Sequence, residues 1–210
     1  MNASLSYTVV DIVGSPFVAI WRPEDGSVCA AGFLAAPSDL ESSRLTVPDA
    51  RAATAGPGGN NGSTAISRAQ VVSDPLWDRL TTSDPGLAGR GLATKPATSG
   101  AVPDALRAYA DGDLAAIDTI AVAQRETPFR GEVSRALRRV PAGDAVTYTT
   151  LAALAGRPAA VRAAASGCAT NLVALIVPCH RIVRADGGLG GYLFGTEVKH
   201  RLLTHEGALG

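Results

Sequence analysis

The sequence predicts an α/β protein of two domains, in which a small antiparallel sheet domain precedes a helical domain with a helix-turn-helix. Three observations support this prediction. Residues 5–34 hold short runs in which apolar side chains alternate, as in strands. Residues 127–168 instead show apolar side chains at helical spacing behind capping residues. The chain of 210 residues suits two small domains, which we place at 1–122 and 123–210.

The N-terminal half is expected to open with three strands, at residues 5–13, 17–21 and 28–34. A Pro-Glu-Asp-Gly turn at 23–26 joins the last two, which indicates an antiparallel meander. The signal for regular structure then weakens. Around residues 50–100 the richness in Gly, Pro, Ser and Thr predicts a long flexible loop.

Three shorter elements complete the N-terminal half. The segment 73–80 is expected to start a short helix, and Pro103 to Asp111 another. Residues 117–122 are expected to form a short strand because they are mostly apolar.

The C-terminal half is better specified. Thr127 caps a first helix that has Pro128 at its first position, and a second helix follows the cap Thr147. After a turn, a third helix is expected over 159–168, beginning behind Pro158. Together the second and third helices predict a helix-turn-helix. The alternative is an Ala-rich hairpin packed on a core, although so many small side chains would gain little by packing there.

An apolar run at 172–177 predicts a buried strand that ends just before Cys179. His180 and Arg181 follow directly, and a neighbouring base or cation favours the reactive thiolate. Cys179 is therefore a candidate nucleophile. On this run alone, an inert cysteine buried in the core is an equally open interpretation.

Composition excludes several classes of protein. The three cysteines, Cys29, Cys168 and Cys179, are sparse and odd in number, which favours free thiols in a reducing cytoplasm. All three histidines lie near the C-terminus, so zinc-site spacings are absent. The first ten residues lack the pattern of a signal peptide, and no apolar stretch has the length of a membrane span.

The formal net charge of zero hides an asymmetry. Residues 125–210 hold 11 Lys and Arg against 6 Asp and Glu, whereas residues 1–124 hold 8 against 13. A basic C-terminal half is consistent with a modest nucleic-acid surface on that domain.

Cys179 and the helical pair together resemble one family closely, the O6-alkylguanine-DNA alkyltransferases, also called methylated-DNA–protein-cysteine methyltransferases. The matching segments cover nearly all of residues 125–207, in order and without gaps. They are Thr127-Pro-Phe-Arg130, Val140-Pro-x-Gly143, Thr147-Tyr148-x-x-Leu-Ala-x-x-x-Gly156, Arg162, Asn171, Pro178-Cys-His-Arg-Ile-Val183, Gly187-x-x-Gly190-x-Tyr192 and Lys199-x-x-Leu-Leu-x-x-Glu206. The N-terminal half matches only loosely, through Ser15-Pro16-Phe17 and Leu106-x-x-Tyr109.

The resemblance implies direct reversal of O6-alkylguanine damage in DNA. The alkyl group would pass irreversibly to the thiolate of Cys179, so each molecule would act once. His180 would take the thiol proton through a water, and Glu206 would orient His180 and stabilise its charged form. Tyr148 would donate to the guanine ring as negative charge develops, and Asn171 would tie the recognition helix to the active-site turn.

The same resemblance implies that the target base leaves the stack and that Arg162 takes its place. The third helix would lie in the minor groove, where small side chains allow close approach, with contacts from Ala160, Ala163 and Ala164. The implied partner is double-stranded DNA that bears O6-alkylguanine. We expect a monomer in the cytoplasm, with no membrane contact, no cofactor and no metal.

The implied substrate pocket includes Pro178, Ile182, Tyr192, Leu193 and Phe194. Backbone carbonyls of Cys179 and Ile182 would accept from the exocyclic amine of guanine, and the amide of Leu193 would serve O6. The family often carries small residues after the tyrosine, so the bulk of Leu193 and Phe194 predicts a preference for methyl over larger groups. For the fold, the resemblance implies a ribonuclease-H-like N-terminal domain and a winged form of the helix-turn-helix.

Alternatives from other classes stay open at this point. A non-enzymatic protein that recognises alkylated DNA would keep the DNA-binding half but lack the acceptor, and Cys179 argues against it. A transcriptional regulator would use the helix-turn-helix alone, yet residues 159–168 hold one Arg and no Asn or Gln to read bases. A cysteine hydrolase is a third alternative, for which no oxyanion hole is identified.

Overall fold

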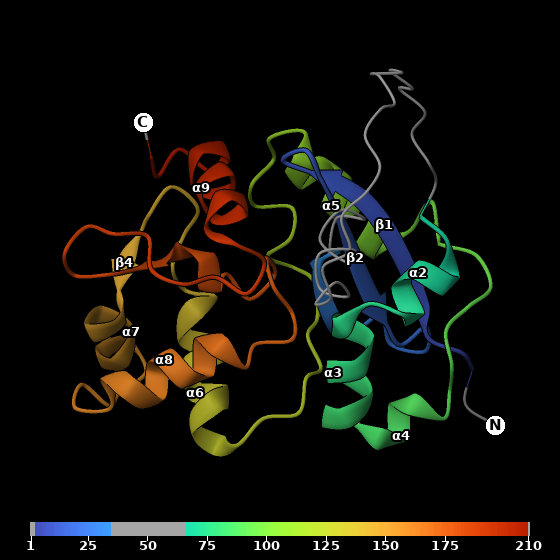
Figure 1. Cartoon of the computed structure of the whole chain (residues 1–210), viewed down its shortest axis with the longest axis horizontal. Helices are drawn as coiled ribbons and strands as arrows, with labels where there is room; N and C mark the ends of the chain where they lie inside the picture. The colour runs from blue at the N-terminus through green and yellow to red at the C-terminus, as the bar shows by residue number, and fades with distance from the viewer. Residues whose placement is uncertain (1–2, 35–65, 210) are drawn as a thin grey trace, which may run out of the picture.

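The computed structural model describes residues 3–34 and 66–209. Within these residues a three-stranded sheet lies between two groups of helices (Figure 1). One buried cluster joins the sheet to the short helices that follow it, and a second joins the sheet to the C-terminal half. The structure is therefore α/β, as the sequence predicts.

The sheet is an antiparallel meander in the order β1-β2-β3, which confirms the sequence prediction. Its strands are β1 (Ser6–Ile12), β2 (Ser15–Trp21) and β3 (Val28–Phe33). In the turn between β2 and β3, Gly26 has a φ of +70°, a backbone conformation that glycine adopts without steric cost.

Strand β3 forms the sheet edge that contacts the C-terminal half. The amide of Ala31 donates to the carbonyl of Leu172 at 2.8 Å, and the carbonyl of Ala31 accepts from the amide of Ala174 at 2.9 Å. This edge is thus satisfied by a segment that lies about 140 residues further along the chain.

Among the described residues between the sheet and position 122, four helices follow the sheet: α2 (Arg68–Val72), α3 (Pro75–Ser83), α4 (Pro85–Ala88) and α5 (Ala101–Ala110). Helices α3 and α5 confirm the two helices predicted in this half. Part of the loop predicted around 50–100 lies outside the described residues. The described part contains α2 to α4, each short and capped by Ser67, Asp74 or Asp84.

The C-terminal half begins with the predicted helices and ends with a further helix. Thr127 and Thr147 cap the first two, each through its side-chain oxygen. Short strands β4 and β5 pair in parallel. The elements are α6 (Pro128–Leu137), β4 (Val146–Thr147), α7 (Tyr148–Leu154), α8 (Val161–Ala169), the 3-10 helix η1 (Cys179–Arg181), β5 (Ile182–Val183) and α9 (Thr196–His205).

The strand predicted at 117–122 is wrong. The amides of Asp118 and Ile120 donate three residues back, which makes successive turns. Ile117 and Ile120 are both buried, and their spacing of three suits turns better than the alternation of a strand. A single bridge, from Val122 to Val28, is the remaining β contact of this segment.

Helix α8 begins at Val161, two residues later than predicted. The amide of Ala160 donates to the carbonyl of Arg157 at 2.8 Å, which closes a turn over Pro158. Ala160 itself has φ −94° and ψ 36°, outside the helical range. Proline at the start of a turn and proline at the start of a helix look alike in sequence.

The strand predicted at 172–177 is also wrong, although all six residues are buried. The amide of Val177 donates to the carbonyl of Val173 at 2.9 Å, and Leu175 adopts a φ of +69°. The segment is therefore a compact turn with one parallel bridge, between Val173 and Ala31. An apolar run predicts burial, but by itself it does not distinguish a strand from a buried turn.

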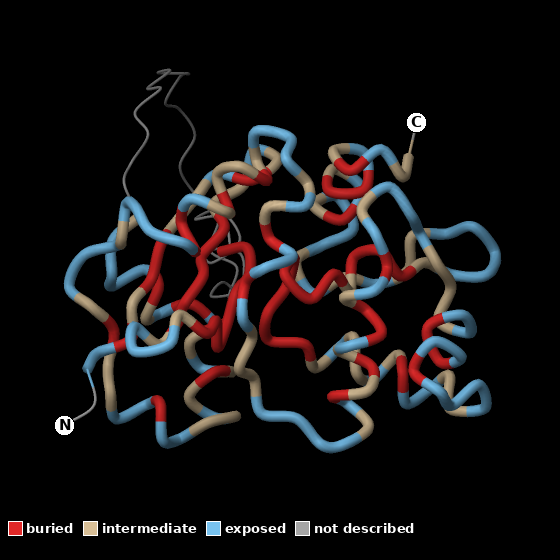
Figure 2. Tube along the Cα trace, turned by 180° about the vertical axis from the view of Figure 1, so that it is seen from behind, coloured by how far each residue is buried: buried red, intermediate tan, exposed pale blue. Residues whose placement is uncertain are grey.

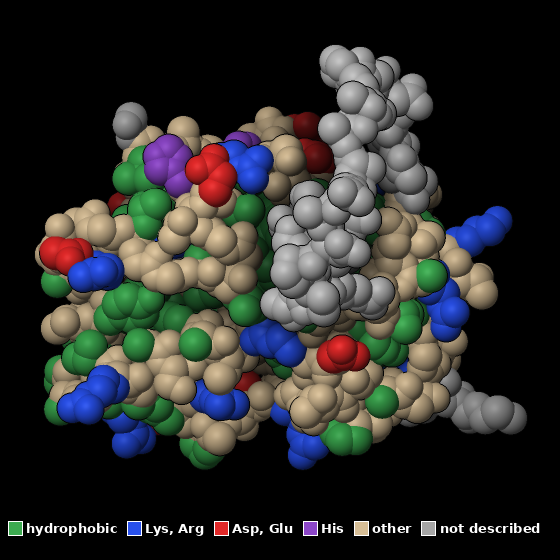
Figure 3. Space-filling view, in the orientation of Figure 1, with side chains coloured by type: hydrophobic (Ala, Val, Ile, Leu, Met, Phe, Trp, Pro, Cys, Tyr) green, Lys and Arg blue, Asp and Glu red, His purple; other side chains and the backbone are tan. Residues whose placement is uncertain are grey.

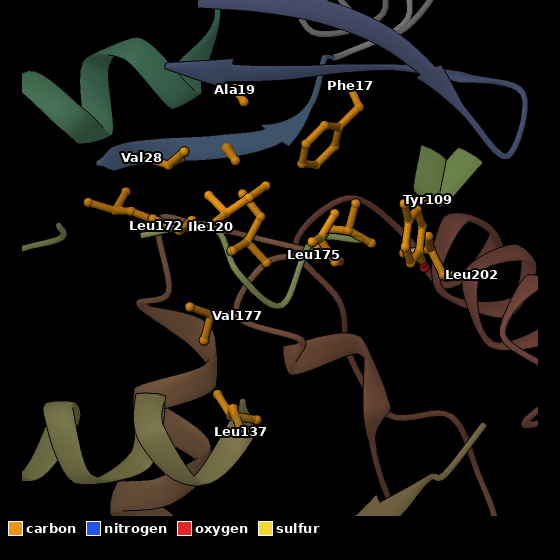
Figure 4. Close-up of a cluster of buried hydrophobic side chains, with 14 of the residues drawn as sticks. Phe17, Ala19, Val28, Tyr109, Ile120, Leu137, Leu172, Leu175, Val177 and Leu202 are labelled. Atoms are coloured by element: carbon orange, nitrogen blue, oxygen red, sulfur yellow. The ribbon is translucent and has the colours of Figure 1, made fainter. Parts of the chain in front are cut away.

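The larger buried cluster contains side chains of both halves. Phe17 and Val28 of the sheet lie over Leu175, Val177 and Leu137 of the C-terminal half (Figure 4). Buried segments from the two sides face each other in the middle of the molecule (Figure 2). The division into domains at residue 122 stays a prediction. Among the described residues, no helix is long and apolar enough to cross a membrane.

Candidate active site

Cys179 opens η1 directly after the buried turn. Its amide donates to the carbonyl of Val177 at 2.8 Å, and the residue is half-buried. It lines a cavity of about 300 Å³ between α8 and the segment that precedes α9. Figure 3 shows hydrophobic side chains in a hollow on this half of the molecule. The cavity is lined by Tyr148, Ala165, Cys168, Ala169, Asn171, Ala174, Cys179, Gly191, Tyr192, Leu193 and Phe194.

Asn171 fixes the turn that presents Cys179. Its side-chain nitrogen donates to the carbonyl of Val177 at 2.9 Å and to the sulfur of Cys179 at 3.3 Å. Its side-chain oxygen accepts from the amide of Val173 at 3.0 Å. Asn171 follows Thr170, the C-cap of α8, so its hydrogen bonds link the end of that helix to the thiol.

His180 and Glu206 form a fully buried pair. The Nε2 atom of His180 lies 3.1 Å from Oε1 of Glu206, and both side chains are 0% exposed. An ionised carboxylate only accepts hydrogen bonds, so Nε2 carries the hydrogen and Nδ1 keeps a lone pair. Burial lowers the pKa of His180, and Glu206 only partly opposes this shift. The imidazole is therefore neutral near pH 7, and its unprotonated Nδ1 can accept a proton.

Two further groups hold Glu206. Arg181 donates to both carboxylate oxygens, from Nε at 2.9 Å and from Nη2 at 2.7 Å, and its Nη1 donates to the carbonyl of Val140 at 2.6 Å. The hydroxyl of Tyr109 donates to Oε1 at 2.7 Å. Burial opposes the charge of Glu206, but hydrogen bonds from His180 and Arg181 outweigh it and hold the pKa at about 2.

The thiol of Cys179 is subject to opposing influences. Burial raises its pKa, while the hydrogen bond from Asn171 and the charges of Lys199 and Arg79 act to lower it. Lys199 is itself fully buried and donates from Nζ to the carbonyls of Ile182, at 2.5 Å, and Leu189. Burial has the largest effect, so the pKa of Cys179 is raised and the thiol is protonated at neutral pH.

Tyr148 belongs to the cavity wall, whereas Arg162 lies on the surface of the neighbouring helix. Tyr148 is half-buried at the start of α7 and lines the cavity; burial raises the pKa of its hydroxyl, so it keeps its proton and can donate. The Arg162 side chain is exposed on α8. Helices α7 and α8 are joined by a turn in which Gly156 has a φ of +77°.

Several predicted positions differ in the structure. Ala164 is 0% exposed and belongs to the core, so the prediction that it contacts DNA is wrong, whereas Ala163 is exposed and Ala160 half-buried. Pro178 and Ile182 are buried and do not line the cavity, and the Ile182 carbonyl already accepts from Lys199. The helical period explains Ala164, because residues of one short helix cannot all face outward.

Tyr192, Leu193 and Phe194 line the cavity as predicted. Leu193 is 58% exposed at its mouth. The Tyr192 ring lies between His180 and Phe194, with ring centroids 6.4 and 5.4 Å away.

Four residues of this site are missing from the sequence prediction: Arg181, Tyr109, Lys199 and Arg79. Three of them fall within the quoted motifs, and Arg181 closely follows an apolar run, where a charged residue is a signal for a buried ion pair. Arg79 lies in a segment with no motif, so only the tertiary structure reveals it. Among the described residues, no group of three or more His, Cys, Asp or Glu side chains is placed to hold a metal.

The arrangement defines a class of protein. A thiol lines an apolar cavity, a neutral histidine held by a buried carboxylate follows it in the chain, and a pair of short helices flanks the opening. Such a site suits transfer of a group to sulfur from a ligand that enters the cavity.

Comparisons with known proteins give the family. The DNA-binding domain of 6-O-methylguanine DNA methyltransferases matches residues 128–208. The methylated-DNA–protein-cysteine methyltransferase of Salmonella typhimurium is 44% identical over 120 residues, which are 57% of this chain and 68% of that protein. The crystal structure of the Mycobacterium tuberculosis O6-methylguanine methyltransferase has a TM-score of 0.59 at 24% identity, over 97% of this chain and 93% of that one, which shows a shared fold. The chain belongs to the family of methylated-DNA–protein-cysteine methyltransferases.

Proposed function

We propose that Cys179 is the residue onto which this methyltransferase takes the alkyl group of O6-alkylguanine in double-stranded DNA. The observation that supports it is the position of Cys179 in the cavity wall, directly before the buried His180–Glu206 pair. The thiolate attacks the alkyl carbon, so a C–S bond forms as the C–O6 bond breaks. The thioether is not hydrolysed, and each molecule acts once.

The proton of Cys179 leaves through His180. Nδ1 of His180 is buried and has no hydrogen-bond partner among the described residues. Buried polar atoms are normally satisfied, so this lone pair is available to a water that bridges to the thiol. Glu206 then stabilises the imidazolium, the role of the carboxylate in hydrolase triads.

Guanine leaves as its ring takes up a proton or a strong hydrogen bond. Tyr148 lines the cavity with a hydroxyl that burial keeps protonated, which suits it to this donation. Asn171 positions the sulfur through its 3.3 Å contact. The substrate wall consists of Tyr192, Leu193 and Phe194.

Helix α8 approaches the minor groove, with Arg162 replacing the flipped base in the stack. Its exposed positions next to Arg162 are small, and Lys and Arg side chains lie along the lower edge of this half in Figure 3. The α7–α8 pair with the β4–β5 strands supports a winged helix-turn-helix, and the meander with α5 packed on β1 supports a ribonuclease-H-like N-terminal domain. The three free cysteines support a cytoplasmic location.

Intact mass after incubation with a duplex that holds O6-methylguanine tests the proposal. The protein is expected to gain the mass of one methyl group, on the peptide that contains Cys179, and Cys179→Ala is expected to abolish the gain while DNA binding stays. Cys168→Ala is the matched control, because Cys168 lines the same cavity. Methylation of Cys168 in the wild type would overturn the assignment.

The same measurement decides against the alternatives. A protein that only recognises alkylated DNA, or a helix-turn-helix regulator, would bind the duplex and keep its original mass.

A further inference from the structure

Phe194 belongs to the C-terminal half, but its ring contacts the sheet of the N-terminal half. Its ring packs edge-on against Phe33 of β3, with centroids 5.7 Å apart, and against Tyr192. The ring also forms part of the wall of the cavity that contains Cys179. Phe194 also lines a second cavity, of about 600 Å³, next to β3 and α3. The ring therefore borders both cavities, and its position depends on its packing against the sheet.

Gly32 of β3 makes room for this ring. A Cβ atom added at Gly32 would lie 2.5 Å from Cζ and 2.8 Å from Cε1 of Phe194, well inside ordinary contact distances. The backbone conformation of Gly32 would accept other residues, since Gly32 is paired with Val18 in regular β-structure and lies outside the left-handed region. Glycine is thus required here by the close approach of Phe194 rather than by backbone conformation.

We propose that Gly32 is a specificity-determining residue for alkyl size, because it forms the slot on the sheet edge that holds Phe194 back from the alkyl cavity. The inference rests on the proposed function and extends it to the size of the alkyl group that is transferred. None of the sheet residues that the structure describes lines the cavity that contains Cys179, yet the contact of β3 with Phe194 limits the volume available to the alkyl group.

The consequence is a size-dependent effect of one methyl group on β3. In Gly32→Ala the Phe194 ring has to move by about 1 Å to reach an ordinary van der Waals distance. Phe33 and Tyr192 flank the ring, so the open side available to it is a cavity. The ring borders two cavities, and we place its displacement in the one that contains Cys179, where it removes room that a benzyl group needs and a methyl group does not. Displacement into the other cavity would leave the ratio of benzyl to methyl transfer unchanged.

The experiment compares transfer rates from O6-methylguanine and O6-benzylguanine in the same duplex. Gly32→Ala is expected to lower the benzyl-to-methyl rate ratio about tenfold, a change of about 1.4 kcal/mol between the two transition states. Gly89→Ala is the matched control, because a Cβ at Gly89 meets nothing within 4 Å. An unchanged or higher ratio in Gly32→Ala would overturn the proposal.

A double-mutant cycle shows whether Phe194 transmits the effect. With Phe194→Ala in place, adding Gly32→Ala is expected to leave the ratio unchanged, because the added methyl group has no ring to displace. A persisting drop would overturn the slot mechanism. If neither substrate alkylates Cys179 in the wild type, the proposed function itself fails, so the two failures are distinguishable.

Discussion

Glu206 holds together three segments that are distant in the sequence. It accepts from Tyr109 of α5, from His180 and Arg181 of η1, and it caps α9. A charge that has so many donors in a dry environment is tightly fixed, and removal of one partner leaves another uncompensated. This residue therefore affects both chemistry and stability.

His180 and Glu206 are expected to act as one unit in transfer. His180→Gln and Glu206→Gln should each slow alkyl transfer, and the double variant should cost little more than the worse single change, since groups in one catalytic chain are not additive. Single-turnover rates on the methylated duplex measure this. Losses that multiply in the double variant would show that the two groups act separately.

Glu206 also gives stability a defined pH dependence. Its pKa is about 2 in the folded chain against an ordinary 4.5, so its stabilising effect is complete above 4.5 and is lost as pH falls toward 2. Glu206→Gln should cost about 3 kcal/mol at neutral pH, because Arg181 stays buried without its partner. Urea midpoints across this range should fall more steeply in the wild type than in the variant. Parallel curves would contradict the assignment.

Arg162 is expected to matter for duplex DNA alone. Arg162→Ala should slow transfer from the methylated duplex, because the gap left by the flipped base costs a few kcal/mol in lost stacking. Reaction with free O6-benzylguanine needs no flipping and should be nearly unchanged. Arg157→Ala is a suitable control, because Arg157 is also exposed but pairs with Glu132. Equal losses on both substrates would refute the role.

At the scale of elements, the sequence predicts helices better than the segments between them. Caps and helical spacing identify α6 and α7 because these signals are local. The turn at 172–177 is shaped by Asn171 and by the bridge to Ala31, neither of which an apolar run reveals. The motif that ends at Tyr192 is enough to predict that Tyr192 to Phe194 line the cavity. Arg79 and Gly32 carry no motif, and only tertiary contacts bring them near it.

Helix α3 brings a cation to the thiol. Arg79 donates from Nη2 to the carbonyls of Asn171 at 3.2 Å and Ala169 at 3.4 Å, and its Nη1 is buried without a partner among the described residues. Its charge is one of those that favour the thiolate of Cys179. If Cys179 is the nucleophile that we propose, the N-terminal half contributes to the electrostatic environment of its thiol.

Arg79→Met should therefore raise the pKa of Cys179 and slow transfer about threefold to tenfold at neutral pH, equivalent to about 1 kcal/mol. The pH profile of iodoacetamide labelling at Cys179, read by peptide mass, separates this from a merely structural effect. Arg79→Lys should restore part of the shift, and Arg107→Met, on the exposed side of α5, should change nothing. Slower transfer with an unshifted profile would contradict the electrostatic role.

The whole molecule depends on contacts between its two halves. The sheet edge at Ala31 pairs with the active-site turn, Phe194 packs on β3, Arg201 of α9 donates to the Val13 carbonyl, and one buried cluster contains side chains from both halves. The sequence correctly predicts a small sheet in the first half and mainly helices in the second. It does not predict that residues of both halves shape the cavity that contains Cys179, because contacts between residues so far apart in the chain leave no local pattern.

The two halves should consequently unfold in one transition. Both tryptophans, Trp21 and Trp77, lie in the N-terminal half, whereas Cys168 lies in the C-terminal half. Urea unfolding followed by tryptophan fluorescence and by mass-detected labelling of Cys168 should give the same midpoint, since a shared core loses its packing on both sides at once. In Ala31→Pro, which removes the amide that donates to Leu172 across the junction, the midpoints should drop together. Two separate midpoints in the wild type would show that the halves fold as independent units, and the influence of Gly32 and Arg79 on the thiol would then need another route.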